Sequence, residues 1–258
     1  MQIQRIQSYP YNTTFKAYEY FRYKSDELGH VIDNIANSSK SWFMRTYPSI
    51  EERVNIFLKE FKNVPKVNFY DFGCSNGSDI YSVLIGLHLN GGYDVLNKFG
   101  PAKCRDICYA PIYAAKKGEY LLNVVEMSEI DRYTNGDFDK YFYSPLRCED
   151  MYRTHRWHIS PYIKDYANFE IGDITEDYKM IEPYNSIVQT RNMWPYLKPE
   201  QKQTLAKNLH DQMRGNAILV IGGIEKDDPF GNRTAAEYLE DAGFVQHPDN
   251  EYIYRVAR

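Results

Sequence analysis

The sequence predicts an α/β protein built on a doubly wound, mostly parallel sheet, and three observations support this fold class. First, a short apolar stretch at residues 67–72 runs through a glycine-containing turn into a helical pattern at 78–89, which is how a βαβ unit begins. Second, the segments at 185–190 and 217–221 are interpreted as buried strands, and both have a suitable length. Third, a helical pattern at 199–214 separates these two segments, and such alternation of strands and helices is typical of an open α/β sheet.

The first clear helix is predicted before the first strand, at residues 49–62. Ser49 has a side chain that suits an N-cap, and Glu52 follows three residues later, which is the spacing of a capping box. Val54 and Phe57 are among the apolar residues that recur at helical spacing. The segment is therefore predicted to be an amphipathic helix.

The remaining elements continue the alternation of strands and helices. A loop is expected from Asn90 to Lys103, after the helix at 78–89. Gly118 and Gly243 are placed to end helices, because glycine readily adopts the left-handed conformation found there. The other predicted elements are strands at 103–108, 169–174 and 252–256 and helices at 111–117 and 234–242.

We divide the chain into an N-terminal helical region (1–62) and a sheet domain (63–258) that carries an inserted subdomain at about 126–166. The N-terminal residues are rich in tyrosine and have weak helical character at 15–28. The insertion combines tyrosines with basic residues, so it is predicted to be either a peptide-docking face or a solvated surface. The basic residues concerned are Arg147, Arg153, Arg156 and Lys164.

Composition narrows the classes of function. Of the 258 residues, 43% are hydrophobic and 16% aromatic, so the chain can bury a core and is not expected to be disordered. The 31 basic and 35 acidic residues leave a net charge of −4, which does not favour nucleic acid as a partner. No apolar stretch approaches the about 20 residues of a membrane-spanning helix, so no membrane insertion is expected. The N-terminus has no apolar leader, and we expect a cytoplasmic protein.

No metal centre is predicted. His155 and His158 form an H-x-x-H pair, but they have no matching cysteine or carboxylate partners. Cys104 and Cys108 are interpreted as ordinary strand and helix residues.

A candidate binding site follows the first predicted strand. Gly73 and Gly77 allow the backbone to approach a ligand at the strand end, where open α/β sheets bind their ligands. Their G-x-x-x-G spacing differs from the dinucleotide pattern G-x-G-x-x-G, and no phosphate-loop lysine follows, so we expect a neutral or cationic ligand. Asp79, in the first turn of the next helix, suits either the helix dipole or a ligand ammonium. The alternative is a tight structural turn.

Asp106 is a second candidate, near the end of the second predicted strand. An acid at this place can hydrogen-bond ribose hydroxyls, as in nucleotide-binding sheets. Alternatively, its carboxylate caps the following helix near Pro111.

Several stretches, in this order along the chain, resemble one known family. Residues 74–82, C-S-N-G-S-D-I-Y-S, are similar to the C-S-T-G-E-E-P-Y-S stretch of the CheR-type methyltransferases, which transfer a methyl group from S-adenosylmethionine (SAM) to glutamate side chains of chemotaxis receptors. Residues 191–197, R-N-M-W-P-Y-L, are similar to the family's R-N-V-x-I-Y-F. The resemblance covers roughly residues 37–258 and implies a class I SAM-dependent methyltransferase, with a Rossmann-like sheet and a small inserted subdomain. Further similar stretches are 39–45, 106–120 and 201–225.

The resemblance also implies a cofactor site. It places the methionine part of SAM on the turn 73–77, its amino group at Asp79 and its ribose at Asp106. Asp173 and Ile174 are expected at the adenine, where Ile174 offers a flat apolar contact; Asp173 is alternatively a loop acid. The full set of predicted cofactor-binding residues is Ser41, Gly73, Cys74, Ser75, Gly77, Asp79, Asp106, Ile107, Asp173, Ile174, Arg191 and Asn192.

Arg45 and Tyr196 match family residues that line the methyl-transfer site, and we predict that they are catalytic. A carboxylate acceptor is ionised at pH 7 and needs no general base, so its methylation requires orientation and desolvation. An arginine fork can hold one carboxylate oxygen, and a tyrosine hydroxyl can position the group. The alternatives are a surface salt bridge for Arg45 and a core aromatic for Tyr196. Residues 192–196 also resemble the N-P-P-Y motif of amine methyltransferases, with one residue more.

Some residues depart from the family pattern. Ser78 replaces the first acid of its glycine-turn motif, Ser39 and Ser41 replace an Asn and a Thr, and Met44 replaces a Phe. These departures concern the methyl acceptor more than SAM. We therefore expect methylation of a protein glutamate, with two alternatives: a methyltransferase of the same fold acting on a small molecule or another protein site, and a non-catalytic SAM-binding regulatory protein.

Overall fold

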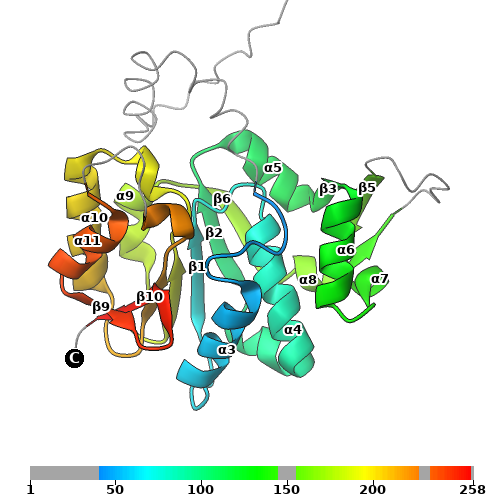
Figure 1. Cartoon of the computed structure of the whole chain (residues 1–258), viewed down its shortest axis with the longest axis horizontal. Helices are drawn as coiled ribbons and strands as arrows, with labels where there is room; N and C mark the ends of the chain where they lie inside the picture. The colour runs from blue at the N-terminus through cyan, green and yellow to red at the C-terminus, as the bar shows by residue number, and fades with distance from the viewer. Residues whose placement is uncertain (1–40, 145–154, 227–232, 257–258) are drawn as a thin grey trace, which may run out of the picture.

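The computed structural model of the chain describes residues 41–144, 155–226 and 233–256 (Figure 1). The predicted features that lie outside these ranges are the weak helix at 15–28, Ser39, Arg147 and Arg153.

Seven strands of the described chain form one sheet, in the order β6-β2-β1-β7-β8-β10-β9. All neighbouring strands from β6 to β8 are parallel, whereas β10 runs antiparallel to both β8 and β9. The strand order reverses direction between β1 and β7, which is where open α/β sheets bind ligands. The predicted doubly wound α/β sheet is confirmed. Its strands are β1 (Asn68–Phe72), β2 (Ala102–Asp106), β6 (Ala167–Ile171), β7 (Ser186–Gln189), β8 (Ile218–Val220), β9 (Phe244–His247) and β10 (Asn250–Val256).

Helices cover both faces of this sheet (Figure 1). Successive side chains of a strand point to opposite faces, so Phe69 of β1 packs with the helices of one face and Tyr70 with those of the other. The first face carries α3 (Ile50–Glu60), α4 (Ser78–Phe99) and α5 (Tyr109–Lys117); the second carries α9 (Ile174–Asp177), α10 (Pro199–Gln212) and α11 (Ala235–Asp241). Short 3-10 segments are η1 (Tyr178–Met180), η2 (Trp194–Tyr196) and η3 (Gly223–Glu225).

Helix α3 begins with the predicted capping box. The Ser49 hydroxyl accepts a hydrogen bond from the Glu52 backbone N–H at 3.2 Å, and the Glu52 carboxylate accepts one from the Ser49 N–H at 2.8 Å. Val54 and Phe57 are buried, as the helical spacing predicts. The same face also buries Arg53, whose role belongs to the site described below.

One prediction about local structure was wrong. The loop expected from Asn90 is instead a continuation of α4, which resumes after Gly91 and Gly92 and ends at Phe99. The two glycines interrupt the helix, since Gly92 has a positive φ of 61°, but buried apolar residues such as Leu96 hold the second part against the core. Strand β9 was not anticipated either; it is a short edge strand that pairs only with β10.

A second, antiparallel sheet of three strands lies beside the first face, at the right in Figure 1. Its order is β3-β5-β4, so the small sheet includes a strand that precedes residue 126. Phe43 packs against this small sheet, with ring centroids 4.8 Å from Tyr120 and 5.0 Å from Phe142. The elements of this part are β3 (Glu119–Leu122), α6 (Val124–Tyr133), α7 (Phe138–Tyr141), β4 (Phe142–Tyr143), β5 (His155–Ile159) and α8 (Pro161–Lys164).

Candidate active site

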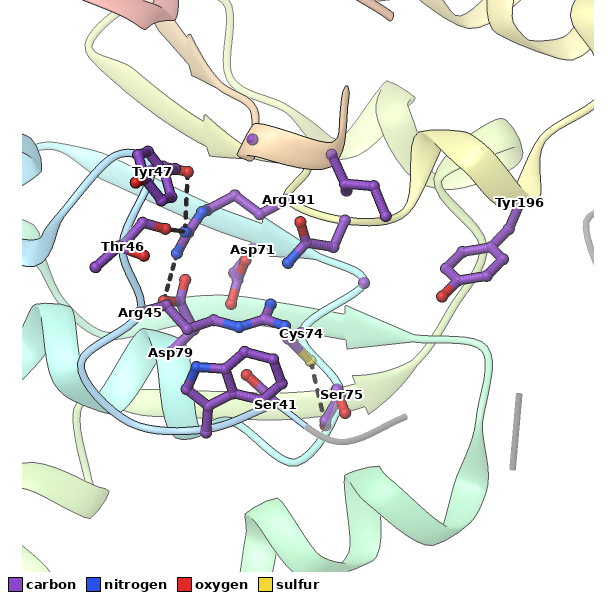
Figure 2. A pocket seen from close by; sticks show the side chains of 15 residues that line it. Ser41, Arg45, Thr46, Tyr47, Asp71, Cys74, Ser75, Asp79, Arg191 and Tyr196 are labelled. Atoms are coloured by element: carbon purple, nitrogen blue, oxygen red, sulfur yellow. Dashed lines mark hydrogen bonds and ion pairs between the residues drawn. The ribbon is translucent and has the colours of Figure 1, made fainter. Parts of the chain in front are cut away.

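A cavity of about 540 Å³ opens at the carboxyl ends of β1 and β7 (Figure 2). Its walls are the segment 41–47, the turn after β1, and the loops that follow β7 and β8. This volume lies within the range of about 300–1,000 Å³ that is usual for small-molecule sites. The residues that line it are Ser41, Trp42, Arg45, Thr46, Tyr47, Asp71, Gly73, Cys74, Ser75, Asp79, Arg191, Asn192, Tyr196, Gly223 and Ile224.

Most of the residues predicted from the sequence meet at this cavity, and five do not line it. Those that line it are Ser41, Arg45, Gly73, Cys74, Ser75, Asp79, Arg191, Asn192 and Tyr196. Those outside the lining are Gly77, Asp106, Ile107, Asp173 and Ile174.

The two glycines of the turn are required by the fold itself. Both have positive φ angles, 73° at Gly73 and 78° at Gly77, which L-residues with a Cβ rarely adopt. A Cβ on Gly77 would lie 2.7 Å from a ring carbon of Phe169, and one on Gly73 would lie 3.0 Å from the Cβ of Met193. The two glycines therefore let the turn pack closely against a neighbouring strand and loop, and Gly73 also lines the cavity.

Asp106 supports the turn from the end of β2. One carboxylate oxygen accepts a hydrogen bond from the Ser75 backbone N–H and the other from the Cys108 N–H, both at 2.8 Å. Cys108 is the N-cap residue of α5, so this carboxylate joins the glycine turn to the start of a helix. This contact lies before the first turn of α5, so the ribose-binding and helix-capping interpretations of Asp106 both stay predictions.

The segment 41–47 is held over the beginning of α4. The carbonyl of Ser41 accepts a hydrogen bond from the Asn76 side chain at 3.3 Å, and the Ser82 hydroxyl accepts one from the Met44 N–H at 3.1 Å. Arg191 closes the other end, because its Nη2 donates to the carbonyls of Thr46 and Tyr47 at 2.9 and 3.2 Å. These contacts attach the wall that carries Arg45 to the rest of the site.

Asp79 is paired with two buried arginines. Arg53 donates from Nη1 and Nη2 to the two carboxylate oxygens, at 2.8 Å each, and Arg191 donates from Nη1 to Oδ1. The positive charges of the two arginines hold the pKa of Asp79 well below its usual range, against the opposing effect of burial. Sequence reasoning missed Arg53; the available signal was its position three residues after Ile50 and four before Phe57, on the apolar face of α3.

Asp71 begins the candidate stretch that leads into the glycine turn, but sequence reasoning gave it no role of its own. It lies in β1 opposite Gln189 of β7, and both side chains point to the α3 face of the sheet. Gln189 donates to Asp71 Oδ1 at 3.4 Å, while Asp71 Oδ2 is buried without a hydrogen-bond partner among the described residues. Burial, reinforced by the negative charge of Asp79, raises the pKa of Asp71 to about 8. A polar residue inside an otherwise apolar strand was the signal for this position.

Arg45 and Tyr196 reach the cavity from different walls and point toward one another in Figure 2. The Arg45 guanidinium lies over the Trp42 ring, 4.4 Å from its centroid. The Asn192 side chain faces the same group; with its amide oxygen turned toward Arg45, it accepts a hydrogen bond from Nη2 at 3.2 Å. Burial lowers the pKa of Arg45, but an arginine stays charged in a protein.

Glu225 is a buried acid behind the cavity wall. One of its carboxylate oxygens accepts a hydrogen bond from the Gly222 N–H at 2.8 Å, which stabilises the loop after β8. Burial raises the pKa of Glu225 to about 7. Three arginines therefore lie around the cavity. Of the acidic residues nearest to the cavity, Asp79 is the one that is held in its charged form.

The residues predicted at the adenine lie farther along the sheet. The Asp173 carboxylate accepts a hydrogen bond from the Thr175 N–H at 2.9 Å and caps α9. Ile174 is buried in the core beside α10, and Ile107 packs against the same core. Trp194, from the stretch that resembles N-P-P-Y, is fully buried and donates from Nε1 to the Thr190 hydroxyl at 2.9 Å.

No group of three or more potential metal ligands is found within the described ranges of the chain. In the same ranges, no helix has the length and apolar character needed to cross a membrane.

A family model for the SAM-binding domain of CheR methyltransferases matches residues 39–233. The chain belongs to the CheR methyltransferase family. It is a SAM-dependent methyltransferase, and its seven-stranded sheet with the antiparallel β10 has the class I arrangement that the sequence predicted. The family implies SAM as cofactor and a methyl acceptor as second substrate.

Solved structures similar to this CheR family member include two methyltransferases. One is a TehB-like SAM-dependent methyltransferase from Corynebacterium glutamicum, with a TM-score of 0.41 and 12% identity, covering 92% of this chain and 100% of that chain. Another is the N-methyltransferase NodS from Bradyrhizobium japonicum, with a TM-score of 0.43 and 13% identity, covering 80% of this chain and 96% of that chain. No curated protein matches the chain.

The cavity fits the charged end of SAM, which carries an ammonium, a carboxylate and a sulfonium. Arg191 lines the cavity with an Nε that is buried without a partner among the described residues, and it suits a carboxylate; the unpartnered oxygen of Asp71 suits an ammonium. A buried acceptor without a donor is costly, so a ligand that supplies one is favoured there.

Proposed function

We propose that this CheR-family enzyme methylates a carboxylate, namely a glutamate side chain of a protein. The observation that supports this proposal best is the placement of Arg45 and Tyr196 on two walls of one cavity. Bound SAM supplies a methyl group on a positively charged sulfur and leaves as S-adenosylhomocysteine (SAH). An acceptor oxygen would form the new O–CH₃ bond with its own electron pair, and the electron pair of the broken C–S bond would stay on sulfur, which becomes neutral.

The chain's own residues bind and orient the acceptor. A carboxylate is ionised at neutral pH, so no side chain has to remove a proton. Arg45 can hold the oxygen that is not methylated, because Trp42 and Asn192 restrict its guanidinium. Tyr196 lines the same cavity, where its hydroxyl can align the acceptor with the methyl group.

The rim of the cavity favours an acceptor that is part of a larger molecule. Trp42 and Tyr47 both line the cavity, yet 53% and 64% of their surfaces are exposed. Exposed aromatic residues are enriched at protein–protein contacts, since they offer a large apolar area at little entropic cost. The site therefore suits a side chain that enters from a protein surface.

The proposal is tested by transferring a labelled methyl group from SAM to an extract that has been divided into protein and small-molecule fractions. We expect label in the protein fraction, and its release by mild alkali, because methyl esters hydrolyse and N-methyl groups do not. Arg45→Met is expected to lower kcat/KM by about 100-fold, the usual effect of removing one charge-stabilising donor. Arg156→Met, which changes an exposed arginine of the small sheet, is the matched control.

Each alternative gives a different result in this experiment. Alkali-stable label contradicts ester formation. Label confined to the small-molecule fraction shows a metabolite acceptor, and binding of SAH without transfer to either fraction shows a regulatory SAM-binding protein.

A further inference from the structure

We propose that Glu225 is a positioning residue for methyl transfer: its buried carboxylate orients the amide of Asn192, and the amide oxygen in turn holds the Arg45 guanidinium at the cavity. Glu225 does not line the cavity itself; it lies behind the wall to which its neighbours Gly223 and Ile224 contribute. The inference rests on the proposed role of Arg45 and extends it to the loop after β8.

The Glu225 carboxylate is buried and only partly paired. Its side chain is fully buried, and Oε2 accepts a hydrogen bond from the Gly222 N–H at 2.8 Å, whereas Oε1 has no hydrogen-bond partner among the described residues. Burial raises its pKa, while the charge of Arg191 and the backbone N–H groups of Trp194 and Met193 oppose this rise. A carboxylate in such a place costs free energy, so a function is expected for it.

The Asn192 amide lies between Glu225 and Arg45. With its oxygen turned toward Arg45, it accepts a hydrogen bond from Nη2 at 3.2 Å, and its NH₂ end then faces acceptors only. A Cβ on Gly222 would lie 2.6 Å from this end of the amide and 2.8 Å from Oε2 of Glu225. The amide and the carboxylate therefore converge on the α-carbon of Gly222, where the absence of a side chain leaves room for both.

A carboxylate beside an amide determines which way the amide turns. An asparagine side chain has one donor end and one acceptor end. The negative charge of Glu225 attracts the NH₂ end and repels the oxygen, so the oxygen is directed to Arg45. The same charge partly offsets the lowering of the Arg45 pKa by burial, which is consistent with Glu225 lying near the guanidinium. Trp42 stacks on the face of this guanidinium, and Asn192 restrains its edge.

Glu225 also lies next to the segment that carries Tyr196. The backbone N–H groups of Met193 and Trp194, which interact with its carboxylate, are at the start of η2, and η2 ends at Tyr196. Figure 2 shows the Arg45 and Tyr196 side chains pointing toward one another across the cavity. One buried carboxylate is thus placed to orient both residues that we propose for the methyl acceptor.

A double-mutant cycle of Glu225 and Arg45 tests the proposal. The readout is the initial rate of labelled methyl transfer from SAM to the protein fraction of an extract. Glu225→Met should lower this rate by about 10- to 100-fold, because a small displacement of an orienting group has an effect of this size. In an Arg45→Met background the same substitution should change the rate by less than about twofold, since the arginine that it positions is gone.

Two further variants separate positioning from a general effect of the substitution. Glu225→Gln keeps the shape and one acceptor oxygen, so it should restore most of the transfer that Glu225→Met loses. Glu240→Met, which changes an exposed glutamate of α11, is the matched control and should transfer at the native rate.

Calorimetry with SAH shows whether the cofactor site is intact. SAH affinity should change much less than transfer in Glu225→Met, because Glu225 does not line the cavity. If this variant does not fold, Glu225→Asp takes its place; it withdraws the charge by one methylene and should lower transfer by about 3- to 10-fold. Equal losses with and without Arg45, or SAH binding that falls in step with transfer, overturn the role of Glu225 alone. An Arg45→Met variant that transfers at the native rate overturns the proposed function as well.

Discussion

The cavity at the large sheet and the small three-stranded sheet are stabilised in opposite ways. Around the cavity, charged side chains are buried and paired with one another, as Arg53 is with Asp79. In the small sheet, the ion pair of Arg156 with Glu119 lies at the surface, and the interior is aromatic, with Phe138 packed on Phe142 and Trp157. Burying a charged side chain costs free energy, so buried charges are usually retained where they have a function. Aromatic packing stabilises the fold without this cost.

The two regions nevertheless meet at the cavity wall. Phe43 lies within the segment 41–47 and packs edge-to-face on Tyr120 and Phe142 of the small sheet. The Tyr120 hydroxyl donates to the carbonyl of Asn76, in the glycine turn, at 2.7 Å. The small sheet therefore supports both the wall that carries Arg45 and the floor of the site.

The largest expected difference between the two regions comes from removing one arginine in each. Arg53→Met leaves Asp79 and Gln189 buried without their main donor, so the free energy of unfolding should fall by about 3–5 kcal/mol. Arg156→Met removes an exposed pair with an Nη1–Oε2 distance of 3.4 Å and should cost about 0–1 kcal/mol. Urea unfolding of both variants measures the contrast.

Equal costs for the two variants would contradict the buried-network interpretation. A useful second readout is SAH affinity, which should fall for Arg53→Met and stay unchanged for Arg156→Met.

The next effect concerns the contact between the two regions. Phe43→Leu keeps most of the apolar volume but loses two edge-to-face ring contacts, which are worth about 0.5–1.5 kcal/mol each. We expect a loss of about 1–3 kcal/mol in unfolding free energy. SAH affinity should also fall, because the wall at 41–47 loses its support. Loss of stability without any change in SAH binding would show that the hydrogen bonds of the wall to Asn76, Ser82 and Arg191 are enough to hold it.

The dependence of stability on pH separates the buried acids. The pKa of Asp71 is raised to about 8 in the folded chain, so between pH 4 and 8 the folded chain holds a proton that the unfolded chain has lost. Stability should therefore fall as pH rises through this window, by up to about 1.4 kcal/mol per pH unit. Glu225, raised to about 7, acts in the same direction, while Asp79, whose pKa is lowered, weakens the fold only under acid conditions.

Asp71→Asn should reduce the dependence of unfolding free energy on pH between pH 5 and 7. The remaining dependence is the contribution of Glu225. Urea unfolding at several pH values gives the slope. An unchanged slope would mean that Asp71 is ionised in the folded protein.

Much of the fold could be predicted because local pattern and burial agree. The capping box at Ser49 and the glycine ends of α5 and α11 are short-range features, and β8 is apolar throughout. The continuation of α4 could not be predicted, because Gly91 and Gly92 signal a loop and only packing of later residues restores the helix. Local signals fail where tertiary contacts decide.

The site was predictable only where its residues belong to a local sequence motif. Motif residues such as Arg45 and Asn192 are recognised from their neighbours in sequence, and they do line one cavity. Arg53, Asp71 and Gln189 come from three separate elements, and local sequence marks Arg53 and Asp71 only as polar residues among apolar ones. Their function arises only because β1, β7 and α3 bring them together.

The smallest expected effect tests one hydrogen bond between the regions. Tyr120→Phe keeps the ring contacts and removes only the hydroxyl that donates to Asn76, so unfolding free energy should fall by about 1 kcal/mol. Burial raises the pKa of Tyr120 well above its usual value, so the hydroxyl remains a donor and the loss should be the same at pH 6 and pH 9. Tyr143→Phe, at an exposed position of the same sheet, is the control and should change stability by less than about 0.5 kcal/mol. If Tyr120→Phe also weakens SAH binding while Tyr143→Phe does not, the small sheet contributes to the geometry of the glycine turn; if neither variant changes SAH binding, its contribution is limited to stability.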